Sequence, residues 1–130
     1  MNWSLKFDED LGIIIVVYAD ICNSKDFEEV AKKRIAIGKE KGIAKALIDL
    51  SWIKTDSIRN ADVKDIVNHM YDQEGNQAHW MLAIITPLSP VAREQVGFLV
   101  RDCKHRGWNV DAFEQRQDAL EWLLEQPSYS

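Results

Sequence analysis

The alternation of apolar and polar positions predicts two strands and a helix at the start of the chain. Residues 3–7 alternate, and after a short acidic turn residues 11–19 form a continuous apolar run. Alternation is typical of a strand with one exposed face and a continuous run indicates a strand buried on both faces, so together they predict an antiparallel hairpin. Residues 24–41 follow with apolar positions at helical spacing, and residues 43–50 predict a second long strand.

The rest of the chain continues this alternation of strands and helices. Helical spacing recurs in residues 57–73 and 90–106, while apolar runs predict strands in residues 79–86 and 108–113. Residues 114–126 predict a final helix. The predicted order of elements is therefore ββαβαβαβα.

Local signals mark the helix ends. Asn23 or Ser24 is placed to cap the first helix, and Gly42 is placed to end it. Pro90 suits the first position of the third helix, where its missing N–H costs nothing, and Gly107 ends that helix.

Strands that alternate with helices predict parallel pairings joined by right-handed crossovers. We expect an α/β fold with a mixed, mostly parallel five-stranded sheet, an N-terminal antiparallel hairpin strand and four helices. The 130 residues fit one domain with one core. In such sheets ligands tend to lie beyond the carboxyl ends of the parallel strands.

Composition and charge narrow the classes of function. The net charge of -5 argues against a nucleic-acid partner, because a basic surface is needed for counterion release. Two basic runs, residues 32–34 and 39–41, indicate a solvated helix face, with a weak basic patch toward anionic lipid as the alternative. The first residues do not resemble a secretory signal, so we expect a cytoplasmic protein, peripheral at the membrane if it binds there. Cys22 and Cys103 are expected to be reduced thiols.

No motif of catalysis occurs in the sequence. It contains no G-x-S-x-G, no Walker loop and no dinucleotide fingerprint, and its three histidines lack zinc-ligand spacing. We therefore predict a protein that is not an enzyme, with no catalytic residues, no cofactor and no metal.

The stretch of residues 49–57 is the most specific feature. A strand ending in "IDLS" leads through a short loop to "DS" at a predicted helix N-terminus, where N–H groups would stabilise a phosphate. This stretch resembles the signature of STAS domains, the anti-sigma factor antagonist family, in which the first serine of D-S-S-G is phosphorylated. The residues that match are Asp49, Leu50, Ser51, Ile53, Asp56 and Ser57, and those that depart are Ile58 and Arg59. Ser57 is thus a candidate phosphoacceptor in a docking loop with Ser51 and Asp56, or a plain helix-cap residue.

A wider resemblance covers almost the whole chain. The element order and the ending "VDAFEQRQDALEWL" are similar to stand-alone SpoIIAA-like proteins of bacteria, members of the STAS superfamily. Their likeness to STAS domains and to CRAL-TRIO lipid carriers implies an apolar ligand or contact with a membrane.

Tryptophans at strand ends suggest where such a ligand would bind. Trp52, Trp80 and Trp108 fall at strand ends or loops, and a tryptophan there suits a ligand pocket or a membrane interface. We predict a binding or membrane-contact site made of Trp52, Ile53, Ile58, Ile66 and Met70, with ordinary core and rim packing as the alternative.

The function we predict is a carrier that binds a small apolar molecule or lipid, or associates reversibly with a membrane surface. The alternative is a STAS-type regulatory domain that docks onto a protein partner through residues 51–57. The exposed edge of the hairpin or an apolar helix face would also allow a homodimer.

Overall fold

The computed structural model describes residues 2–53 and 80–125. In this part of the chain five strands form one sheet in the order β1-β2-β3-β4-β5. β1 runs antiparallel to β2, and all other neighbours are parallel, as predicted. The strands are β1 (Trp3–Asp8), β2 (Ile13–Asp20), β3 (Lys45–Ile53), β4 (Met81–Ile85) and β5 (Asn109–Phe113).

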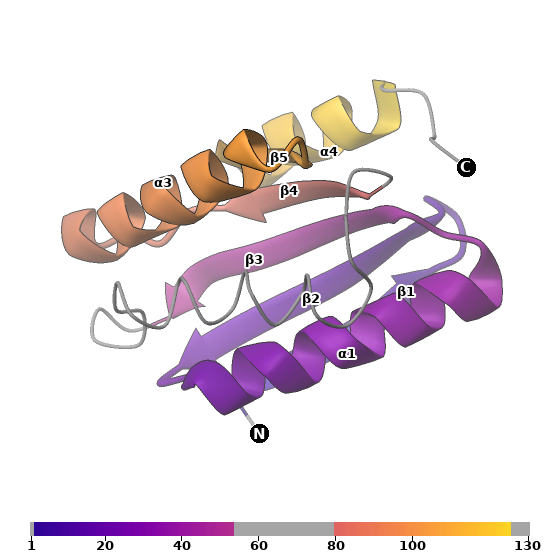
Figure 1. Ribbon diagram of the computed structural model, residues 1–130, viewed down its shortest axis with the longest axis horizontal. Coiled ribbons are helices and arrows are strands. Elements are labelled where there is room, and N and C mark those ends of the chain that lie inside the picture. Colours follow the sequence, from indigo (N-terminus) through magenta and orange to yellow (C-terminus); the bar gives the residue numbers. More distant parts are fainter. Residues whose placement is uncertain (1, 54–79, 126–130) are drawn as a thin grey trace.

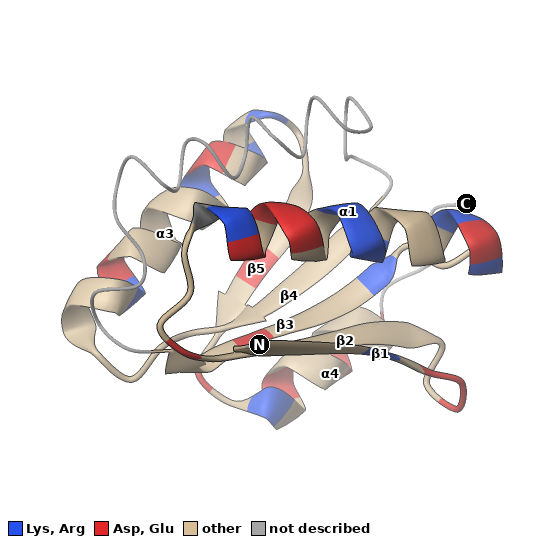
Figure 2. Ribbon diagram, turned by 90° about the horizontal axis from the view of Figure 1, so that it is seen from below, with Lys and Arg blue, Asp and Glu red and all other residues tan. Residues whose placement is uncertain are grey.

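Helices cover both faces of the sheet. Figures 1 and 2 show α1 (Ser24–Lys41) and α3 (Pro90–His105) on one face and α4 (Arg116–Glu125) on the other. The described residues thus contain three helices where the sequence predicted four for the whole chain. The remaining predicted helix, residues 57–73, lies outside the described residues.

The boundaries of α1 follow from its sequence. The Asn23 side chain accepts from the Asp26 N–H at 3.0 Å, and the Asp26 carboxylate accepts from the Asn23 N–H at 2.9 Å, which makes a capping box. The cap is therefore Asn23. Gly42 ends the helix with a φ of 68°, the left-handed conformation that glycine adopts most easily. α3 begins at Pro90 as predicted, although the Ser89 side chain makes no capping hydrogen bond.

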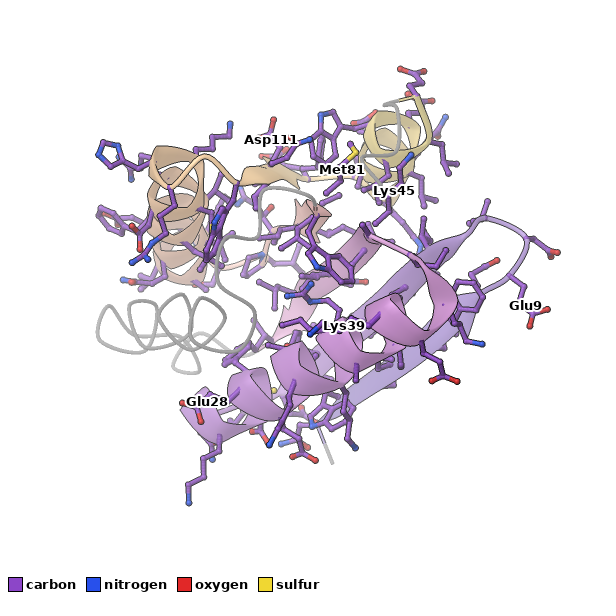
Figure 3. All side chains as sticks on the ribbon, turned by 45° about the vertical axis from the view of Figure 1, so that its right-hand side comes forward. Glu9, Glu28, Lys39, Lys45, Met81 and Asp111 are labelled. Carbon is purple, nitrogen blue, oxygen red and sulfur yellow. The ribbon has the colours of Figure 1, made fainter. Side chains whose placement is uncertain are left out.

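The sheet separates two apolar layers because β2, β3 and β4 bury side chains on both faces. The layer under α1 and α3 includes Val16, Leu50, Leu82 and Val100. The layer under α4 includes Ile13, Leu47, Met81, Ala83 and Leu123. Figure 3 shows Lys45 and Met81 on the α4 side of the sheet, where Lys45 Nζ donates to the Leu123 carbonyl at 2.7 Å.

Several element ends differ from the predicted ones. β3 continues through Ile53, because Trp52 and Ile53 pair with Ala19 and Asp20 of β2 beyond a register shift. Ser51, which was predicted as part of a docking loop, therefore lies within a strand. α4 begins at Arg116, two residues later than the predicted start.

Three side chains that the sequence placed in a pocket, at a membrane interface or in solvent are buried in the core. Trp80 and Trp108 were candidates for a pocket or a membrane interface, yet both lie in the core under α1 and α3. Arg34, in the predicted solvated run 32–34, is only 2% exposed. Its place in α1 explains this, because residue 34 follows Phe27, Val30 and Ala31 at helical spacing and so shares their buried face.

Candidate functional site

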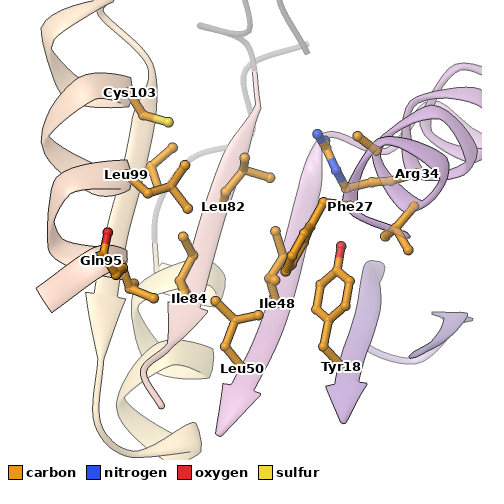
Figure 4. A pocket seen from close by; sticks show the side chains of 14 residues that line it. Tyr18, Phe27, Arg34, Ile48, Leu50, Leu82, Ile84, Gln95, Leu99 and Cys103 are labelled. Atoms are coloured by element: carbon orange, nitrogen blue, oxygen red, sulfur yellow. The ribbon is translucent and has the colours of Figure 1, made fainter. Parts of the chain in front are cut away.

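A cavity of about 60 Å³ lies between α1 and α3 above the sheet (Figure 4). α1 forms one wall, α3 forms the opposite wall and β3 and β4 form the floor. The described residues that line it are Tyr18, Phe27, Val30, Ala31, Arg34, Ile48, Leu50, Leu82, Ile84, Gln95, Val96, Leu99, Cys103 and Val110.

Helical spacing in α1 and α3 and alternation in β3 and β4 together produce this apolar lining. Side chains at helical spacing point from α1 and α3 toward the sheet, and alternate residues of β3 and β4 point back toward the helices. Ile48 and Leu50 are two residues apart in β3, and Leu82 and Ile84 are two apart in β4. Each pair therefore contributes two side chains to the same face.

The volume of the cavity limits what it can hold. A water molecule needs about 10–15 Å³ of such space, and a cavity of about 150 Å³ with an apolar lining stays dry and binds benzene. At about 60 Å³ this cavity has room for a group of a few heavy atoms. Long acyl chains would not fit unless the walls moved.

The cavity also carries polar groups. Burial raises the pKa of the Tyr18 hydroxyl well above its usual range, so Tyr18 stays protonated and can donate a hydrogen bond. Its ring packs 4.7 Å from that of Phe27, measured between centroids. Burial likewise raises the pKa of the Cys103 thiol to about 12, so Cys103 is a thiol rather than a reactive thiolate at neutral pH.

Two further polar side chains reach the cavity from opposite walls. Gln95 of α3 has a buried Oε1 with no hydrogen-bond partner among the described residues. Arg34 of α1 stacks on Trp80, with the guanidinium carbon 4.5 Å from the ring centroid. The cavity is thus apolar over most of its surface, with a cation on one wall and an amide on the other.

A second surface lies at the carboxyl ends of the parallel strands, the left side of Figure 1, where α1 and α3 begin. Trp52, near the end of β3, is 68% exposed, and Leu88, after β4, is 77% exposed. Asp49 of β3 pairs with Ile85 of β4. Trp52 follows Asp49 by three residues and Leu88 follows Ile85 by three residues, so both lie toward the same edge of the sheet. Ile21 and Val91 add exposed apolar side chains, and these four residues are called the carboxyl-edge patch below.

Ser51 and Asp49, from the predicted docking stretch, lie beside each other in β3. The Ser51 hydroxyl donates to the Asp49 carboxylate at 2.5 Å, and the Ser51 N–H donates to the same oxygen at 2.9 Å. Arg116 at the start of α4 lies 3.7 Å from the other carboxylate oxygen. These contacts link the end of β3 to α4.

The predicted site residues do not meet in one described pocket. Trp52 is exposed at the strand end, while Ile53 is buried in the core under α1 and α3, and neither is among the described residues that line the cavity. The other predicted site residues are outside the described part of the chain, namely Asp56, Ser57, Ile58, Ile66 and Met70. Sequence reasoning missed Arg34 and Tyr18, although the spacing of Arg34 from Phe27 in α1 was a readable signal.

Comparison with known proteins identifies the fold. The chain is similar to the crystal structure of an uncharacterised protein of the DUF3478 family with a SpoIIAA-like fold from Shewanella loihica, with 19% identity and a TM-score of 0.58. The match covers 93% of this chain and 91% of that one. The chain therefore has a SpoIIAA-like α/β fold, as the sequence resemblance implied.

Other comparisons add little. A crystal structure described as Mglu is 8% identical, with a TM-score of 0.36 over 88% of this chain and 20% of that one, and it carries no argument. No protein-family model matches the sequence, and no curated protein matches it significantly. Among residues 2–53 and 80–125, no helix is long and apolar enough to cross a membrane. The same residues contain no group of three acidic, histidine or cysteine side chains arranged to hold a metal.

Proposed function

We propose that this SpoIIAA-like protein is a non-enzymatic module that binds a small apolar molecule in the cavity between α1 and α3. The observation that carries the proposal is the cavity itself, with its largely aliphatic and aromatic lining. Apolar surface that faces an unfilled space lacks dispersion contacts, and an apolar guest restores them. The proposal moves the binding site from the predicted neighbourhood of Trp52 to the facing sides of α1 and α3.

Xenon tests this proposal because it is a neutral apolar probe of atomic size. We expect one saturable site, detected as shifts in the ¹H–¹³C NMR signals of methyl groups in Leu82, Ile84 and Leu99. Ala31→Val adds two carbons at the cavity wall and should weaken xenon binding, whereas Leu99→Ala enlarges the space and should strengthen it.

Both variants must first be shown to unfold cooperatively in urea. Absence of xenon shifts in the folded wild-type protein would contradict the proposal. So would equal xenon binding by the wild-type protein and both variants.

The second candidate is a docking module, favoured by the exposure of the carboxyl-edge patch. Four apolar side chains at one edge of a sheet are typical of a surface that a partner covers. The net charge of -5 opposes approach to an anionic bilayer, so a protein partner fits this patch better than a membrane. The predicted role of Ser57 as a phosphoacceptor belongs to this second candidate.

Site-specific cross-linking tests the docking candidate. A photoreactive phenylalanine analogue at position 52 should cross-link to one partner protein in cells, and Leu88→Ser should reduce that product. The same analogue at Leu124, an exposed apolar position on α4, serves as the matched control and should not yield it. Sedimentation of purified protein with anionic vesicles, lost on Trp52→Ser, would instead indicate membrane association.

A further inference from the structure

Gln95 is the feature of the cavity that apolar binding alone does not explain. It lies on the α3 wall, and its buried Oε1 accepts no hydrogen bond within the part of the chain that the structure describes. An acceptor that is removed from water and left unsatisfied lowers stability, whereas an apolar side chain of the same shape carries no such cost. Folded proteins contain few such atoms, so this one calls for an explanation.

The surroundings of Gln95 favour a guest with one donor rather than a polar cluster. Figure 4 shows Gln95 on the same wall as Leu99 and facing Ile84 of β4, and these two side chains carry no hydrogen-bond donor. A buried water molecule needs about two to four polar partners. The last torsion of a glutamine side chain is soft, so the amide can turn its oxygen toward a guest while the α3 backbone stays in place.

We infer that Gln95 Oε1 accepts a hydrogen bond from the ligand, so that the cavity selects small neutral alcohols over molecules of the same size that lack a donor. This inference rests on the proposed function and names its class of ligand. The hydroxyl group would satisfy the buried acceptor, and the aliphatic body would contact the apolar lining. A cationic donor such as an ammonium group is disfavoured, because its desolvation in an apolar cavity is costly. The volume of about 60 Å³ favours a molecule the size of propan-2-ol.

Propan-2-ol and acetone form the decisive pair of probes, because they have the same number of heavy atoms and only the alcohol can donate. In NMR titrations of the wild-type protein, we expect propan-2-ol to bind at least about five times more tightly than acetone, the gain expected when a buried acceptor is satisfied. Both probes should shift the methyl signals of Ile84 and Leu99. Gln95→Met should bring propan-2-ol down to the level of acetone. Gln117→Met is the matched control, since Gln117 is exposed on α4 and donates to Glu121, and it should leave both affinities unchanged.

Unfolding in urea gives a readout that does not depend on any ligand. Glutamine and methionine have similar helix propensities, so Gln95→Met mainly removes the buried acceptor. We expect this variant to have a higher urea midpoint than the wild-type protein, and Gln117→Met to leave the midpoint nearly unchanged. A lower midpoint for Gln95→Met would show that the amide already stabilises the fold, and would overturn the inference.

The outcomes separate this inference from the proposed function. Xenon binding together with equal affinity for propan-2-ol and acetone, or with a preference for acetone, would overturn the role of Gln95 and leave the apolar site standing. A preference for propan-2-ol that persists in folded Gln95→Met would overturn that role too. Absence of binding by xenon and by both organic probes would overturn both. If Gln95→Met does not fold, the role of Gln95 is again overturned, because the amide would then be needed for the fold itself.

Discussion

Gly38 of α1 packs closely against the ring of Trp80. A Cβ atom at position 38 would lie 2.5 Å from two carbons of the Trp80 ring and 2.6 Å from the Ile43 carbonyl oxygen. Trp80 is buried and stacks with Arg34, so it has little room to yield. Gly38 is therefore required by close approach.

We predict that Gly38→Ala lowers the free energy of unfolding by about 1–3 kcal/mol, the usual cost of overpacking. Gly97→Ala in α3 is the matched control, because its added Cβ would meet only Arg101 Nη2 at 3.8 Å. That change should stabilise the protein by about 0.5–1 kcal/mol through helix propensity. Urea unfolding followed by tryptophan fluorescence measures both, and equal effects of the two changes would contradict the account.

The buried thiols predict a loss of stability at alkaline pH. Burial raises the pKa of Cys103 to about 12 from 9.0, and the neighbouring Asp102 raises it further. Between these values the unfolded chain has lost the thiol proton while the folded protein retains it, so stability falls as pH rises, by up to about 1.4 kcal/mol per pH unit for one thiol. Below pH 9.0 the contribution of Cys103 is fully present.

Cys103→Ala should therefore be less sensitive to pH than the wild-type protein. We expect the difference in free energy of unfolding between the two to narrow from pH 9 to pH 11. Cys22→Ala should behave similarly over a narrower range, because the pKa of Cys22 is raised to about 11. A constant difference across this pH range would show that the Cys103 thiol does not titrate differently in the two states.

Residue-level prediction succeeded where local chemistry decides and failed where packing decides. The choice between Asn23 and Ser24 as the cap remained open, since both types cap helices, and the capping box resolves it in favour of Asn23. Arg34 was assigned to solvent because its neighbours Lys32 and Lys33 are charged, yet only Arg34 lies on the inner face. A run of charged residues reports only composition, whereas the position of each residue around the helix axis determines which of them is buried.

At the scale of elements, the two long helices begin in different ways. α1 starts with a reciprocal capping box, while α3 starts with Pro90 after a Ser89 side chain that makes no capping hydrogen bond. We predict that Asn23→Ala destabilises the protein by about 1 kcal/mol, and that Ser89→Ala changes stability by less than about 0.5 kcal/mol. Chemical denaturation of the two variants in parallel measures this, and a larger loss for Ser89→Ala would contradict the assignment of the caps.

Element types were predictable because their apolar periods are distinct, but element ends were less so. β1, β2, α1, α3 and β5 lie within a residue or two of their predicted ranges. β3 extends three residues further, because pairing of Trp52 and Ile53 with β2 is a long-range contact that leaves no local signal. The cavity was likewise unpredictable, since its two walls come from helices that are separated by much of the chain.

At the scale of the whole molecule, the sheet joins two apolar layers into one structure. The central strands β2, β3 and β4 contribute side chains to both layers. Unfolding of one layer would therefore disrupt strands that the other layer needs. Sequence patterning predicted these doubly buried strands and the parallel pairings. It could not assign α1 and α3 to one face and α4 to the other.

This shared sheet predicts that the described fold unfolds as one cooperative unit. Leu123 in α4 is fully buried in one layer, and Leu82 in β4 is buried in the other. Leu123→Ala and Leu82→Ala should each cost about 2–5 kcal/mol. Each should shift one transition that is the same by far-UV circular dichroism and by tryptophan fluorescence, as expected for a small domain.

If Leu123→Ala moved only part of the circular dichroism signal and left the fluorescence of buried Trp80 and Trp108 unchanged, the α4 layer would be an independent unit. Leu124→Ala, at the exposed neighbour of Leu123, is the control and should change stability by less than about 0.5 kcal/mol.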